Sequence, residues 1–75
     1  MDKFKELSEE IIEALKPNVQ PNNVLLLGAQ FMYKEQKYGD IIENFKEQLE
    51  FDLDRYTDYL GSNQELVNRI LNCEL

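Results

Sequence analysis

Histidine is absent from this sequence of 75 residues, and Cys73 is its only cysteine. Without histidine the chain lacks the usual general base, the imidazole metal ligand and any serine-histidine or cysteine-histidine nucleophile. One cysteine excludes an internal disulfide and is too few for a structural zinc site. The three glycines are isolated from one another, so no glycine-rich loop can hold a phosphate group. The sequence therefore predicts a protein that is not an enzyme and that uses no cofactor and no metal.

Long hydrophobic runs are also missing. The longest apolar stretch extends from Val24 to Ala29 and continues from Phe31 to Tyr33, which is about half of the ~20 residues that a membrane-spanning helix needs. We interpret it as a buried core helix and predict no association with a membrane. The N-terminal residues have mixed charge and lack the apolar segment of a secretory signal. A cytoplasmic location is the resulting expectation, and a lone cysteine agrees with a reducing compartment.

Basic residues are few: the sequence has eight lysines and arginines and fifteen aspartates and glutamates, which gives a formal net charge of −7. This charge repels the phosphates of nucleic acids and disfavours direct binding to DNA or RNA. The same charge speeds the encounter with a basic protein surface or peptide. A basic protein is therefore the partner that the composition favours.

Apolar residues recur at helical spacing along most of the chain, and no stretch alternates cleanly between apolar and polar residues as a strand would. We predict an all-α fold, a single domain over residues 1–75. Its four helices, joined by short loops, are expected at residues 2–16, 23–37, 40–60 and 63–73. The predicted core comprises Leu7, Ile11, Leu27, Phe31, Phe45, Leu49, Leu53, Tyr56 and Ile70.

The expected helix ends follow from capping residues. Asp2 caps the first helix, and Asn22 or Asn23 caps the second. Gly39 and Gly61 stop the second and third helices. Capping boxes at residues 40–43 and 62–65 predict the starts of the third and fourth helices.

The segment from Leu27-Gly28 to Leu49-Glu50, with Phe31, Tyr38 and Phe45, resembles one tetratricopeptide unit. The resemblance covers about a third of the chain, and no second copy is present, although such arrays need about three repeats. We interpret it as convergent chemistry of a helical hairpin. A genuine unit would imply a peptide-binding or docking surface.

Acidic residues gather on one side of the third predicted helix. At about 100° per residue, a sector of about 80° contains Asp40, Glu43, Glu47, Glu50, Asp54 and Asp58. Asp2, Glu6, Glu9 and Glu13 form a similar ridge on the first helix. Like charges four residues apart destabilise a helix by about 0.2–0.5 kcal/mol per pair. One interpretation is a solvated polar face, and the other is a surface that docks a basic partner.

Other functions for these acids are disfavoured by the sequence. Asp52, Asp54 and Asp58 superficially match a calcium loop, but the glycine of its turn is missing and the pattern there is helical. Carboxylate pairs such as Glu43 and Glu47 lie on an open face, where nothing would separate their proton affinities for acid-base catalysis.

Phe51 lies about half a turn from the core stripe of the third helix, next to the acids. An exposed aromatic side chain among charges is typical of an interface hot spot. The alternative is that the last helix or the N-terminal loop covers Phe51, and the sequence does not separate the two.

The second predicted helix is apolar almost all round, which indicates a central helix or one shared with another chain. A homodimer through Leu25, Leu26, Met32 and Tyr33 is therefore an alternative assembly.

The function hypothesis is a small acidic, non-catalytic protein-binding module, such as an inhibitor, adaptor or regulator. Its partner-binding residues are predicted to be Asp40, Glu43, Glu47, Glu50, Phe51, Asp54 and Asp58. One form of the hypothesis is a nucleic-acid mimic that blocks a nucleic-acid-binding protein. The alternatives are a structural homo-oligomer and, third, an enzyme that relies on carboxylates alone.

Overall fold

Five α-helices and no strand make up the fold in the computed structural model, which describes residues 2–75. The helices are α1 (Lys3–Leu15), α2 (Val24–Lys34), α3 (Tyr38–Phe51), α4 (Leu53–Tyr59) and α5 (Gln64–Leu71). The predicted all-α class is confirmed. The prediction of four helices is wrong, because the expected helix at 40–60 is divided into α3 and α4.

Side-chain caps begin three of the helices as the sequence predicted or nearly so. The Asp2 carboxylate accepts a hydrogen bond from the Phe4 backbone N–H at 2.9 Å, and Asn23 accepts one from Leu25 at 2.8 Å. At α5 the cap is Asn63, whose side chain accepts from Leu66 at 3.1 Å. The predicted capping box from Ser62 to Glu65 is therefore wrong by one residue.

The turn between α2 and α3 differs from the prediction. Gln36, not Gly39, takes the left-handed conformation after α2, with φ of 61°. The Lys37 N–H bonds the Met32 carbonyl at 2.8 Å, and the Gln36 N–H bonds the Tyr33 carbonyl at 3.0 Å, which together form a Schellman motif. Gly39 instead lies in the first turn of α3, which begins at Tyr38 without a side-chain cap. The predicted capping box at 40–43 is also wrong, since those residues are already helical.

The break between α3 and α4 occurs at Asp52, whose backbone has φ of −149° and ψ of 84°. Its side chain accepts a hydrogen bond from the Arg55 N–H at 3.3 Å and so caps α4. Aspartate favours caps over helix interiors because its short carboxylate competes for nearby backbone N–H groups. Gly61, with φ of 75°, follows α4 as the predicted stop.

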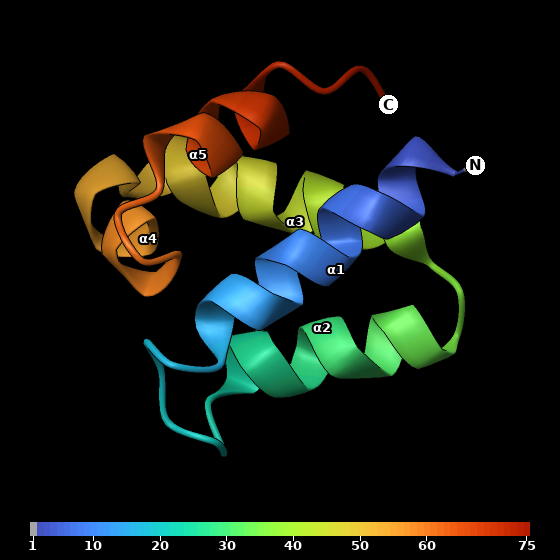
Figure 1. Ribbon diagram of the computed structural model, residues 1–75, viewed down its shortest axis with the longest axis horizontal. Helices are drawn as coiled ribbons and strands as arrows, with labels where there is room; N and C mark the ends of the chain where they lie inside the picture. The colour runs from blue at the N-terminus through green and yellow to red at the C-terminus, as the bar shows by residue number, and fades with distance from the viewer. Residues whose placement is uncertain (1) are drawn as a thin grey trace.

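The helices surround one apolar core. Figure 1 shows α1 crossing in front of α3, with α2 along the lower edge, α5 above and α4 seen nearly end-on beside α3. The largest side chains that lose almost all contact with solvent come from α1, α3 and α5 and from Leu60, which directly follows α4. They are Phe45, Ile11, Leu15, Ile41, Ile42, Leu49, Leu60 and Ile70. α2 contributes Leu26 and Ala29. The core therefore lies between α1 and α3, with the other helices around it.

Five of the nine predicted core residues, Leu7, Ile11, Phe45, Leu49 and Ile70, are buried. Tyr56 is only partly buried, and three predictions are wrong: Leu27 is 49% exposed, Phe31 56% and Leu53 51%. α2 turns Leu26 and Ala29 inward, and this places Leu27 and Phe31 on its outer side. Leu53 is displaced from the stripe because the helix breaks just before it.

Polar contacts join α1 to α3 and hold the segment after α5 against α3. The buried Ser8 hydroxyl lies 2.7 Å from the Phe4 carbonyl oxygen and 3.1 Å from that of Tyr38. The Lys46 amine donates to the Cys73 carbonyl at 2.7 Å and so holds the segment after α5 against α3.

Candidate protein-binding surface

Four of the predicted partner-binding carboxylates lie together on the outer side of α3. Asp40, Glu43, Glu47 and Glu50 are all exposed. They are opposite the buried residues Ile41, Ile42, Phe45 and Leu49, because α3 is amphipathic. These four residues are called the α3 acidic face below. Nothing desolvates them, so their chemistry is that of charged acceptors for lysine or arginine.

Asp54 and Asp58 are also exposed, but they belong to α4. Figure 1 shows that α4 turns away from the direction of α3. The continuous ridge of six carboxylates on one helix, which the sequence predicted, is therefore wrong in its geometry. The structure retains an acidic face on α3 and adds a separate pair of acids on the next helix.

The α3 acidic face has no ion pair within residues 2–75. The ion pairs in this part of the chain are Lys16 with Glu13, Arg55 with Asp52, and Arg69 with Glu10. Lys46, the only base on α3, is directed to the Cys73 carbonyl. The negative charge of this face is thus left uncompensated by the fold.

The acids of α1 are used differently. Asp2 caps the helix, Glu13 pairs with Lys16 at 3.0 Å, and Glu9 accepts a hydrogen bond from the Tyr33 hydroxyl on α2. Glu10 pairs with Arg69 of α5 at 2.7 Å. Most carboxylates of α1 therefore contribute to the fold, and the similarity that the sequence suggested between the two acidic ridges does not extend to their roles.

Phe51 is the most exposed large apolar side chain in the described residues, at 82%. It lies at the C-terminal end of α3, one turn beyond Glu47 and directly after Glu50. The alternative that the last helix or the N-terminal loop covers it is wrong. Leu53, half-exposed beyond the Asp52 break, adds a second apolar side chain that sequence reasoning placed in the core.

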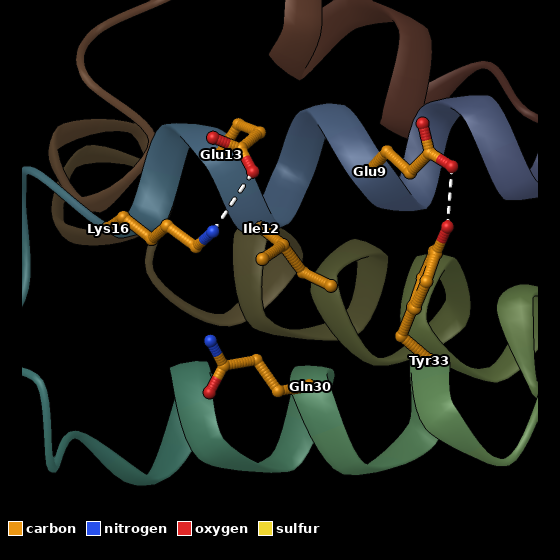
Figure 2. Close-up of a pocket in the computed structure, with 6 residues that line it drawn as sticks. All are labelled: Glu9, Ile12, Glu13, Lys16, Gln30 and Tyr33. Carbon is orange, nitrogen blue, oxygen red and sulfur yellow. Dashed lines mark hydrogen bonds and ion pairs between the residues drawn. The ribbon is translucent and has the colours of Figure 1, made fainter.

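A groove of about 380 Å³ runs between α1 and α2 and is shown in Figure 2. Its lining includes Glu9, Glu13, Lys16 and Tyr33, and these groups pair with one another across and along it. The hydrogen bond to Glu9, with smaller effects of burial and of the Glu9 charge, raises the pKa of Tyr33 to about 12. Glu9, Glu13, Lys16 and Tyr33 already have partners within this groove, whereas the carboxylates of the α3 acidic face have no ion pair, so the acidic surface is the stronger candidate.

The described residues contain neither a candidate metal site nor a candidate membrane span. Within residues 2–75, histidine, cysteine, aspartate and glutamate nowhere gather in threes as a metal site would require. None of the helices in that range combines the length and apolar character needed to cross a membrane.

The residues predicted for self-association mostly face inward. Leu26 is buried, and Leu25, Met32 and Tyr33 are partly buried against the core of the same chain. The apolar residues that α2 exposes are Val24, Leu27 and Phe31. Sequence reasoning missed this face because a helix that is apolar all round does not reveal which side turns inward.

Comparison with known proteins found no match to a family model, a curated protein or a solved structure.

Proposed function

We propose that this chain is a small acidic protein-binding module, an inhibitor, adaptor or regulator without catalytic activity of its own. It docks a basic surface or peptide of a partner protein through the α3 acidic face, with Phe51 as the apolar anchor. Asp54 and Asp58 extend the contact onto α4. The observation that carries the proposal is Phe51, 82% exposed beside carboxylates that the fold leaves without ion pairs.

Two physical arguments support this function. Like charges on the α3 acidic face oppose helix formation, since Glu43 and Glu47 are four residues apart, and no internal base offsets that cost. An aromatic side chain in water likewise gains nothing for the monomer, whereas inserted in a partner's pocket it is a typical hot spot. Both features become favourable only when a basic, partly apolar surface covers them.

The test begins with affinity capture of the partner from the native host, followed by calorimetry on the purified pair. Neutralising the face with Glu43→Gln, Glu47→Gln and Glu50→Gln should weaken binding by tenfold or more, about 1.4 kcal/mol. The matched control neutralises three exposed acids elsewhere, Glu6, Glu65 and Glu74, and changes the net charge equally. It should leave affinity nearly unchanged, and equal losses in both variants would mean that only overall charge matters.

Phe51→Ala should weaken the same complex by about 1–3 kcal/mol, as truncation of a hot-spot aromatic does. Because the side chain is exposed, the free energy of unfolding of the free protein should hardly change.

The nucleic-acid-mimic form of the proposal adds that DNA or RNA displaces the protein from its partner. Unchanged affinity in both the acid-neutralised and Phe51 variants would overturn the proposed function.

A further inference from the structure

α2 presents an apolar stripe to solvent, formed by Val24, Leu27 and Phe31 at 79%, 49% and 56% exposure. These residues are spaced by three and four positions and lie opposite the inward-facing Leu26 and Ala29. Figure 1 shows α2 at the edge of the molecule, with no helix beyond it. Exposed apolar residues that share one side of a helix form a candidate interaction site. These three residues are called the α2 stripe.

The chain segment that contains α2 differs in charge from the rest of the chain. Residues 16–39 contain three lysines and one glutamate, a formal charge of +2, whereas the other 51 residues contain five bases and fourteen acids, a charge of −9. Two copies that meet through α2 therefore keep their acidic surfaces apart. Contact through the α3 acidic face would instead bring like-charged carboxylates together, at a cost that rises as salt falls.

The two flanks of the α2 stripe carry opposite charges, so the flanks of two copies can be complementary to each other. Lys34 and Glu35 are exposed and lie about 50° to either side of the stripe, at almost the same height along the helix. A two-fold axis parallel to the helices brings opposite flanks of two copies together, so each Lys34 faces the Glu35 of the other copy. Space on the Glu35 side is open, because a Cβ built on Gly28 would meet no atom within 4 Å.

We propose that a second copy of this chain covers the α2 stripe, in a two-fold dimer whose α2 helices run side by side in the same direction. Apolar contact between the stripes supplies the attraction. The reciprocal Lys34 and Glu35 pairs select the parallel arrangement over the antiparallel one.

The size of the surface sets the strength of the dimer. A standard interface buries about 800 Å² per partner, roughly a sixth of the 4950 Å² that the monomer exposes. A helix of 11 residues is only about 16 Å long. The stripe and its flanks fall below the standard area, so the dimer belongs to the weak, concentration-dependent class.

Sedimentation velocity from about 10 μM to about 1 mM covers the range in which a small interface associates. The average mass should rise toward twice that of the monomer as concentration increases. The double variant Leu27→Gln with Phe31→Gln should shift the midpoint concentration upward by tenfold or more. It keeps the charge and the helix propensity, and circular dichroism verifies that it folds.

The matched control is Phe51→Gln, which removes an exposed phenylalanine that lies on α3, beside the α3 acidic face and outside the α2 stripe. It should leave the midpoint unchanged. A second test exchanges the flanking charges. Lys34→Glu should weaken association, and adding Glu35→Lys to it should restore the dimer, because the reciprocal pair is reformed with its signs reversed.

Several outcomes would overturn the proposal. These are a monomeric mass throughout the concentration series, an equal effect of Phe51→Gln, or a charge exchange that fails to restore association. A dimer that survives the Leu27 and Phe31 changes would place the interface elsewhere. The dimer does not depend on the proposed docking of a basic partner, since Phe51→Gln should damage that docking alone and the stripe variant should damage only self-association.

Discussion

At the scale of single residues, the contact between Tyr33 and Glu9 joins α2 to α1 by one side-chain hydrogen bond. The ring of Tyr33 also packs edge-on against Tyr38, with ring centroids 5.1 Å apart. The spacing of apolar residues in the sequence could assign Tyr33 and Glu9 to two different helices, but it could not predict the hydrogen bond between them. Pairing depends on the crossing of two helices, which is a tertiary property.

The Tyr33 contact leads to a pH-dependent prediction. The pKa of Tyr33 is raised from 10.0 to about 12, so its contribution to stability is present below pH 10 and is lost as pH rises toward 12. Urea unfolding of the wild type and of Tyr33→Phe should differ below pH 10, and the difference should vanish near pH 12. Glu9→Gln is the control, because it should return the phenol titration toward its ordinary range. A difference that persists at pH 12 would contradict this account.

At the scale of helices, the sequence predicted which segments are helical better than it predicted where each helix begins and ends. Asp2 and Asn23 cap the starts of α1 and α2 as expected, because each side chain accepts a backbone hydrogen bond. Gly61 follows the end of α4 as expected, because glycine readily adopts a positive φ. Gln36 was missed because nothing in a glutamine indicates a left-handed conformation. The nearby Gly39 was the reasonable but wrong choice for the same role.

The division of the predicted helix at 40–60 has a similar explanation. The apolar spacing continues through Leu49, Leu53 and Tyr56, so periodicity alone indicates one helix. Asp52 can either continue that helix or cap the next one, and its capping bond to Arg55 forms in the structure. Periodicity does not decide between these two roles of Asp52, and Leu60, directly after α4, is buried in the observed arrangement. This break also divides the predicted acidic ridge.

A proline substitution tests the break directly. Leu53 is the first residue of α4, a position where proline is tolerated, whereas proline inside a helix costs about 3 kcal/mol or more. Leu53→Pro should therefore lower the free energy of unfolding by much less than Glu47→Pro, which lies within α3. Chemical denaturation of the two variants gives the comparison. Similar, large losses in both would indicate one continuous helix from α3 into α4.

At the scale of the whole molecule, the uneven distribution of charge is the dominant feature. The principal dimensions are 29, 27 and 19 Å, so at about 0.01 M salt, where the Debye length is about 30 Å, every charge interacts with every other. Composition alone gives the net charge of −7, and a basic partner stays a prediction from that charge. Composition could not predict that α1 would use its acids internally while α3 would not, since that depends on which helices meet.

Salt should therefore stabilise the free protein. Raising sodium chloride from about 0.01 M to about 0.5 M shortens the Debye length to a few ångströms and screens repulsion among the exposed carboxylates. The three ion pairs are exposed and contribute little that screening could remove. Urea unfolding, which adds no ions, should show a higher free energy of unfolding at high salt.

The rise should be smaller in the variant with glutamine at positions 43, 47 and 50, because part of the repulsion is already gone. The same salt increase should weaken docking to a basic partner, so stability and affinity should change in opposite directions. A free energy of unfolding that falls with salt would mean that attraction, not repulsion, dominates the charge interactions of this fold.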